Sequence, residues 1–98
     1  MSKNRIYISG AITGTDDYME RFAKAEKKLS EQGYSVINPA KVNAQLPKDT
    51  YYKDYMKMCL CMLDMCDAIC MLKGWSKSCG ANRELGFAMA KGKIIMYE

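Results

Sequence analysis

Histidine is absent from this chain of 98 residues, so it lacks the side chain that most often acts as an acid, a base or a metal ligand near neutral pH. Long apolar runs are missing too, and no stretch reaches the roughly 20 apolar residues that a membrane span requires. The segment Met1–Arg5 leads into a short apolar strand without the hydrophobic region of a secretory signal. We therefore expect a cytoplasmic protein with no membrane partner.

Neither sign of charge dominates the chain. Lys and Arg total 15 against 11 Asp and Glu, a formal charge of +4, and the densest basic cluster is only Lys24, Lys27 and Lys28. A nucleic-acid binder would carry a basic stripe with interleaved aromatic residues, so we expect no nucleic-acid partner. The mild excess favours small anionic ligands, although a lysine-rich solvated surface explains it more simply.

The five cysteines form neither a disulfide pattern nor a metal-binding pattern. Cys59, Cys61, Cys66 and Cys70 fall within twelve residues, where the geometry of a helix and a strand opposes orderly pairing. Their spacings match no standard zinc or iron–sulfur motif. We expect reduced thiols packed as small hydrophobic residues, with no metal and no cofactor.

The order of apolar segments predicts a single domain over residues 1–98 in which strands and helices alternate. Apolar runs at 5–9, 34–37, 67–72 and 93–97 indicate strands, and stripes of helical period indicate helices at 17–33, 52–63 and 79–91, with a loop at 40–49. Asp16 or Asp17 can cap the first helix. The pattern βαβαβαβ predicts an α/β fold: a Rossmann-like three-layer sandwich around a four-stranded parallel sheet.

Two glycine-containing loops, at 10–14 and 74–80, follow strands and should open at the carboxyl edge of this sheet, where ligands bind. Beside them, Glu84 shares the inward face of the last helix with Ala81, Leu85 and Ala88. A buried carboxylate is costly unless partners satisfy it or a site uses it. The alternative is a structural acid that pairs with a cation of the same region: Arg83, Lys91 or Lys93.

The segment before that helix offers hydroxyls, flexible backbone and the N–H groups of a helix start, a combination that suits an anion. Ser76, Ser78 and Gly80 are therefore candidate phosphate-binding residues. Ser78 and Gly80 would also serve as an ordinary helix cap and turn. An anion site beside an inward carboxylate is a site for a phosphorylated substrate.

Several motifs spread along the chain resemble one known family. They are Tyr7 in the first strand, Gly10-x-x-x-Gly14, Asn38-Pro39-Ala40, Cys66-Asp67-Ala68-Ile69, Gly74-Trp75-x-x-Ser78-x-Gly80-Ala81-x-x-Glu84 and Gly92-Lys93-x-Ile95. Together they resemble the nucleoside 2-deoxyribosyltransferase-like superfamily, most closely its small DUF4406-type branch, and are similar to the nucleoside 5′-monophosphate N-glycosidases. The resemblance implies a flavodoxin-like sheet and a homodimer or larger homo-oligomer.

The resemblance also implies roles for individual residues. Glu84 matches the nucleophile that attacks the anomeric carbon, and Tyr7 would orient it. Ser78 matches a phosphate-binding serine. Gly10, Ile12 and Gly14 would line the substrate from the first loop.

In two places the chain departs from the family pattern. Cys59 stands where catalytic members carry an aspartate that assists the leaving base, and Ala11 and Thr13 stand where the nucleotide hydrolases tend to carry serine and arginine. We therefore expect cleavage of the N-glycosidic bond of a nucleoside or nucleoside 5′-monophosphate, with hydrolysis favoured over transfer. The alternatives are a nucleotide-binding module that has lost catalysis and a scaffold with a vestigial pocket.

Overall fold

The computed structural model describes residues 5–98. Met1–Asn4, on which the expected lack of a secretory signal partly rests, lie outside the described residues. None of the helices within residues 5–98 has the length and hydrophobicity needed to cross a membrane.

Four parallel strands form the centre of the molecule. They are β1 (Arg5–Ser9), β2 (Ser35–Ile37), β3 (Ala68–Met71) and β4 (Ile94–Tyr97), in the order β2-β1-β3-β4. Tyr7 of β1 lies beside Ile37 on one side and Ile69 on the other. The parallel sheet expected from the sequence is confirmed, and its strand order reverses direction between β1 and β3.

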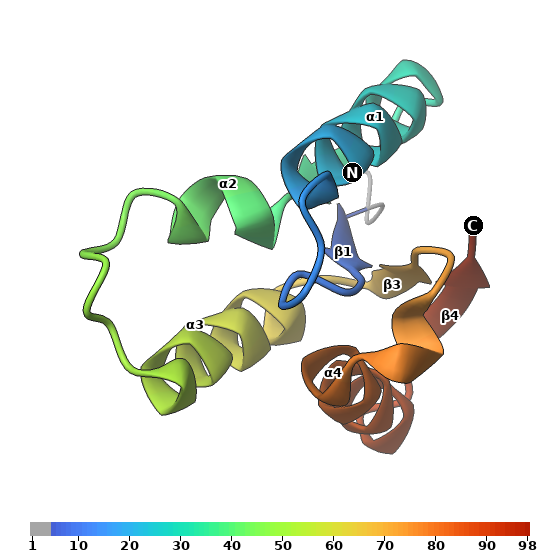
Figure 1. The fold of residues 1–98 in the computed structure, drawn as a ribbon. Coiled ribbons are helices and arrows are strands. Elements are labelled where there is room, and N and C mark those ends of the chain that lie inside the picture. The colour runs from blue at the N-terminus through green and yellow to red at the C-terminus, as the bar shows by residue number, and fades with distance from the viewer. Residues whose placement is uncertain (1–4) are drawn as a thin grey trace.

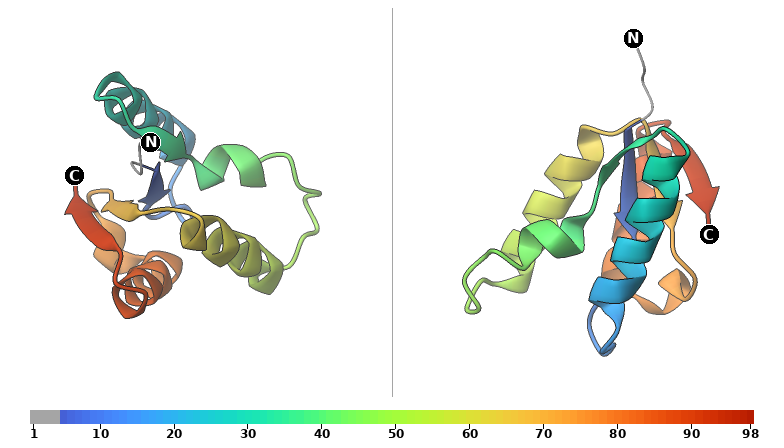
Figure 2. Two further views of the ribbon diagram at one scale, coloured as in Figure 1. Left: turned by 180° about the vertical axis from the view of Figure 1, so that it is seen from behind. Right: turned by 90° about the horizontal axis from the view of Figure 1, so that it is seen from above.

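The helices cover the sheet from both sides (Figures 1 and 2). The helix α1 (Tyr18–Glu31) packs on one face, and α3 (Tyr52–Asp64) and α4 (Cys79–Ala90) pack on the other. A short 3₁₀ helix, η1 (Trp75–Lys77), precedes α4. The molecule is thus the expected three-layer α/β sandwich.

Successive side chains of β1 point to opposite faces of the sheet, so the core has two parts. Ile6 and Ile8 point to the α1 layer, where they pack with Phe22 and Leu29. Tyr7 points to the opposite layer and packs with residues of α3 and α4. Because successive side chains of a strand face opposite sides, Ser9 lies on the same side as Tyr7.

The segment expected as a loop at 40–49 begins with a helix, α2 (Pro39–Asn43), so that expectation is wrong for its first residues. The Asn38 side chain accepts hydrogen bonds from the backbone N–H groups of Ala40 and Lys41, at 3.1 and 3.3 Å. Pro39 occupies the first helical turn, where its missing N–H costs nothing. Asn38-Pro39 therefore ends a strand and also starts a helix.

Two further expectations need correction. Asp17 precedes α1, but its side chain makes no capping hydrogen bond and pairs instead with Arg21 at 3.1 Å. The cysteines are free thiols as expected, and Cys59, Cys66 and Cys70 are buried, yet Cys61 and Cys79 are exposed.

Candidate functional site

A cavity of about 820 Å³ opens at the carboxyl edge of the sheet. Gly10, which follows β1, and the segment 77–81, which follows β3 and η1, belong to its wall. These two segments flank the point where the strand order reverses, the usual ligand position in open parallel sheets. The other walls come from α1, α2 and α3.

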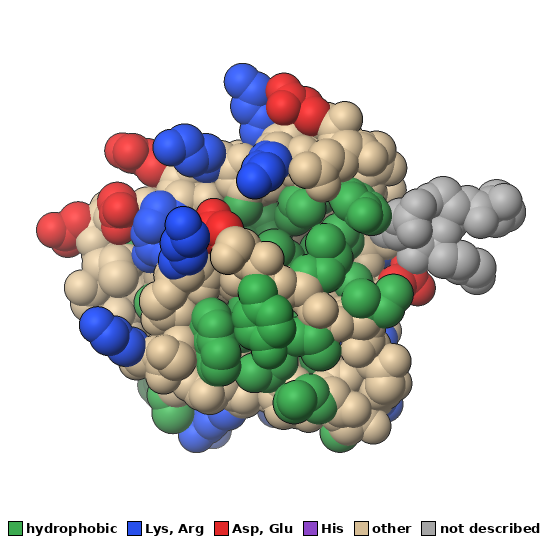
Figure 3. All heavy atoms as spheres, turned by 90° about the vertical axis from the view of Figure 1, so that its right-hand side faces the viewer, with side chains coloured by type: hydrophobic (Ala, Val, Ile, Leu, Met, Phe, Trp, Pro, Cys, Tyr) green, Lys and Arg blue, Asp and Glu red, His purple; other side chains and the backbone are tan. Residues whose placement is uncertain are grey.

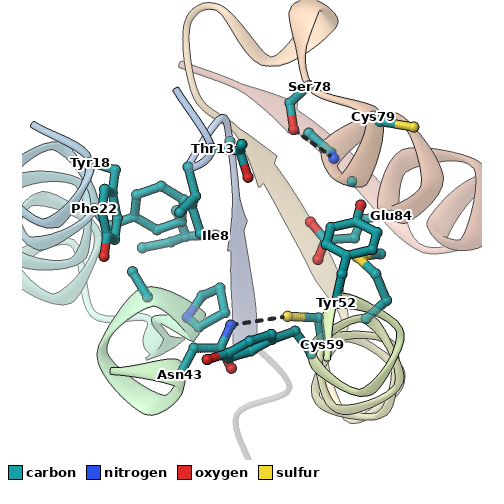
Figure 4. Close-up of a pocket in the computed structure, with 18 of the residues that line it drawn as sticks. Ile8, Thr13, Tyr18, Phe22, Asn43, Tyr52, Cys59, Ser78, Cys79 and Glu84 are labelled. Carbon is teal, nitrogen blue, oxygen red and sulfur yellow. Dashed lines mark hydrogen bonds between the residues drawn. The ribbon is translucent and has the colours of Figure 1, made fainter. Parts of the chain in front are cut away.

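Glu84 of α4 projects into this cavity (Figure 4) and is held by two hydroxyl groups. The Tyr7 hydroxyl donates to Oε2 of Glu84 at 2.6 Å, and the Ser9 hydroxyl donates to Oε1 at 2.6 Å. Tyr7 is 0% exposed, Ser9 1% and Glu84 6%. Each carboxylate oxygen thus has its own short hydrogen bond, a geometry that stabilises the ionised form and fixes its orientation.

The cations considered as structural partners of Glu84 are engaged elsewhere. Lys91 pairs with Asp64 at 3.7 Å, and Lys93 donates to the backbone carbonyls of Asp64 and Cys66. Arg83 lies over the Tyr52 ring. The partners of Glu84 are therefore neutral donors, which hold the carboxylate without cancelling its charge.

Burial and hydrogen bonding act on the Glu84 carboxyl in opposite directions. Burial raises its pKa, while hydrogen bonds from Ser9 and Tyr7 oppose that rise, and the pKa remains above its ordinary value. A carboxylate with a raised pKa is more basic and hence a better electron-pair donor than an exposed one.

Tyr7 and Cys59 form the floor around this carboxylate. Burial and the negative charge of Glu84 raise the pKa of Tyr7 well above its usual value, so Tyr7 is a permanent hydroxyl donor. Burial also raises the pKa of the Cys59 thiol, which packs in the same core cluster as Tyr7. Asn43 donates to the Cys59 sulfur at 3.5 Å.

The start of α4 forms the rim on the side of Glu84. The Ser78 hydroxyl accepts from the N–H of Ala81 at 3.1 Å, as a helix cap does. A hydroxyl that accepts in this way can still donate its proton to an anion. Gly80 lets the Tyr52 hydroxyl approach α4, since a Cβ on Gly80 would lie 3.2 Å from it.

The first loop contributes to the opposite rim. Gly10, Ile12 and Thr13 line the cavity, and Arg21 donates to the Ala11 carbonyl oxygen at 2.8 Å. Gly10 packs tightly, because a Cβ there would meet Leu72 at 3.0 Å. The cavity therefore brings together the candidates Tyr7, Gly10, Ile12, Ser78, Gly80 and Glu84, whereas Gly14 and Ser76 lie outside its lining.

Ser9 was missed by sequence reasoning, although a signal for it exists. Tyr7 and Ser9 are two residues apart in one strand and hence on one face. Once Tyr7 is assigned to Glu84, Ser9 follows as a second donor. Lys48 and Lys77, two cations of the cavity wall, also went unassigned. Within residues 5–98, no cluster of acidic or cysteine side chains could hold a metal ion.

The fold is that of 2-deoxyribosyltransferases. The structure superimposes on the 2-deoxyribosyltransferase of the bacterium Bacillus psychrosaccharolyticus with a TM-score of 0.76 and 19% sequence identity, over 95% of this chain and 70% of that one. The values for a 2-desoxiribosyltransferase from Leishmania mexicana are 0.71 and 22%, over 96% of this chain and 63% of that one.

The chain belongs to the family DUF4406, a domain of unknown function, whose pattern matches residues 4–97. The resemblance found in the sequence is thereby confirmed at the level of family and fold. No match is found among the curated proteins.

Proposed function

We propose that the chain cleaves the N-glycosidic bond of a nucleoside or nucleoside 5′-monophosphate, with Glu84 as the nucleophile. The observation that carries this proposal is a buried carboxylate that faces a cavity and receives one hydroxyl hydrogen bond on each oxygen, both at 2.6 Å. The similarity in fold to 2-deoxyribosyltransferases supports the same chemistry.

The chemistry follows from the charge that develops on the sugar. As the bond to the base lengthens, the anomeric carbon becomes oxocarbenium-like, and a carboxylate on the opposite face stabilises it and then bonds to it. Tyr7 and Ser9 hold the carboxylate in one orientation throughout. Water then attacks the glycosyl ester and releases the sugar.

A phosphorylated substrate fits the rim of the cavity better than an unphosphorylated one. Ser78 and the first N–H groups of α4 can hold an anion, and Lys48 and Lys77 line the same cavity. Neutral and cationic groups suit a phosphate, whereas an acidic side chain in the place of Ser78 would repel it. Hydrolysis of a nucleoside 5′-monophosphate is therefore the leading reaction, without metal or organic cofactor.

Self-association belongs to the same proposal. The Tyr51 side chain, at the start of α3, is 69% exposed, and that of Met65, at its end, is 59% exposed. A separate group of hydrophobic side chains lies on the face of the molecule formed around β4, which Figure 3 shows. Ile94 and Tyr97 of β4 are exposed to 63% and 59%. Exposed apolar surface of this kind suits a homodimer.

The test of the catalytic proposal is base release. Purified protein is incubated with a panel of nucleoside 5′-monophosphates and nucleosides, and free base is measured by chromatography. Glu84→Gln should abolish base release while calorimetric titration still detects binding, because the amide keeps the shape but loses the nucleophile. Glu31→Gln, on the exposed end of α1, is the matched control and should behave as the unaltered protein.

A nucleotide-binding module is the second candidate, because Cys59 occupies the floor where an acid is expected. It would bind a nucleotide in the titration and release no base from any compound. Base release that persists in Glu84→Gln would remove Glu84 from the mechanism.

A further inference from the structure

The cavity holds one acidic side chain. Glu84 is the sole Asp or Glu among the described residues that line it, and the chain contains no histidine. A glycosidase normally needs two such groups, one at the sugar and one to protonate the departing base. If Glu84 is the nucleophile, no second carboxyl or imidazole is present for the base.

Cys59 cannot fill that gap efficiently. It is 6% exposed and lies on the floor beside Tyr7 and Glu84. Burial raises the pKa of its thiol, which makes it a weaker acid than an ordinary cysteine. A general acid works best with a pKa near the working pH. A substrate whose base needs no proton would make such an acid unnecessary.

The aromatic side chains of the lining suit a flat cation, whereas Lys48 and Lys77 of the same lining suit the phosphate. Tyr18 of α1 lies across the cavity from Tyr52 and Glu84 (Figure 4). Phe22, which packs behind it, is 0% exposed and offers no ring face to a ligand. Tyr55 is a further aromatic residue of the lining. Faces of aromatic rings attract cations, and quaternary nitrogen compounds are commonly bound among several such rings. The one carboxylate adds a negative charge where the base joins the sugar.

We infer that the substrate is an N-glycoside whose base carries a quaternised ring nitrogen at the glycosidic bond or in the same ring system, such as a pyridinium or N7-alkylpurine nucleotide. This inference rests on the proposed function. Glu84 attacks the anomeric carbon, and the carbon–nitrogen bond breaks with both electrons passing to the base. The base leaves as a neutral molecule without receiving a proton.

The second step restores the enzyme. Water attacks the anomeric carbon of the ester, the electron pair of the bond to Glu84 returns to the carboxylate, and the proton of the water passes to solvent. The sum is cationic nucleotide plus water giving neutral base, sugar phosphate and one proton. A neutral purine or pyrimidine would leave as an anion, and among residues 5–98 no carboxyl other than Glu84 lines this cavity to protonate it.

Two matched pairs of compounds test the inference. The first pair is 7-methylguanosine 5′-monophosphate and guanosine 5′-monophosphate, and the second is nicotinamide mononucleotide and its reduced, neutral form. Free base is measured for each. Protonation of a leaving group contributes about 10²- to 10⁴-fold, so we expect kcat/KM to favour the cationic member by more than about 100-fold in at least one pair. The pair that reacts identifies the ring system.

The outcomes separate this inference from the proposed function. Base release with less than about 100-fold preference in both pairs overturns the inference and leaves the glycosidase proposal standing. No base release from any of the four compounds or from the wider panel overturns both. Cys59→Asp gives a second measurement if it folds: the new acid should narrow the preference by raising the rate on the neutral member. An unchanged preference in a folded Cys59→Asp protein contradicts the inference.

Discussion

Glu84 combines burial with a full set of hydrogen bonds, and the balance between them has consequences for pH. Burial raises the pKa of the folded-state carboxyl above its ordinary value of 4.5. The folded protein therefore holds this proton more tightly than the unfolded chain does. The contribution of Glu84 to stability is largest when both states are protonated, and it falls as pH rises from about 4.5 through the folded-state pKa.

The first prediction is a difference in the pH dependence of stability. Glu84→Gln cannot ionise, so its free energy of unfolding should lack this decrease, and the variant should gain stability relative to the unaltered protein as pH rises above about 4.5. Urea unfolding at several pH values measures the effect. Parallel pH curves for the two proteins would show that Glu84 ionises equally easily in both states.

A second prediction concerns Ser9. Ser9→Ala removes the donor to Oε1 of Glu84, and a hydrogen bond to a charged group contributes about 1.5–3 kcal/mol. The pKa of Glu84 should rise further, so the acid limb of the pH–activity profile should move to higher pH. Ser35→Ala, on the exposed side of β2, is the matched control. If Ser9→Ala lowers stability but leaves the acid limb of the pH–activity profile unchanged, Ser9 has a structural role and does not set the pKa of Glu84.

At the scale of elements, α2 shows how a few residues shape the cavity wall. It has only five residues, and Asn38 joins it to the rest of the molecule by capping its start and donating to Glu26 at 3.1 Å. Pro39, Ala40 and Asn43 of this helix line the cavity. The cavity wall opposite Glu84 therefore depends on the hydrogen bonds that Asn38 makes at the start of α2.

Asn38→Ala is the third prediction. Loss of a helix cap costs about 0.5–2 kcal/mol, and α2 is too short to persist by its own propensity. We expect reduced stability and weaker ligand binding, with base release per bound ligand little changed, because Glu84 and its donors lie in other elements. Ser30→Ala, at an exposed position of α1 away from the cavity lining, serves for comparison. A loss of kcat alone would contradict this expectation.

The sequence predicts the long elements well and the short ones poorly. Helices α1, α3 and α4 each bury a stripe of helical period, so their positions follow from the pattern of apolar residues. The five residues of α2 carry no such period, and their start signal, Asn38-Pro39, is also a strand-stop signal.

The candidate site also has a part that the sequence predicts and a part that it does not. The contact between Tyr7 and Glu84 could be expected, because an inward acid on α4 faces the side chains of the central strand. The cavity wall made by α1 and α2 could not, since it depends on how helices far apart in the sequence lie over the sheet edge. Tyr18 and Phe22 read as ordinary core residues of α1 in the sequence, yet they also line the cavity.

At the scale of the whole molecule, the proposed dimer has two candidate contact surfaces, one at the ends of α3 and one on β4. The fourth prediction is that sedimentation at micromolar concentration shows a dimer, and that Tyr51→Lys at the start of α3 weakens it. Ile94→Lys on β4 is the matched change on the other surface, where Trp75 and Tyr97 also pack with ring centroids 6.2 Å apart. If Ile94→Lys dissociates the dimer and Tyr51→Lys does not, the interface lies at β4. If the unaltered protein is a monomer, the proposal of a dimer is wrong.

The two hydrogen bonds on Glu84 also bear on the kinetics of folding. Tyr7 lies 77 positions from Glu84 in the chain, and Ser9 lies 75 positions from it. The paired strands β1 and β3 are also far apart in the sequence. Contacts between such remote segments form slowly, because the intervening chain must first lose its freedom. During refolding, helical content should therefore return before the carboxylate acquires its donors, and activity should be the last property to recover.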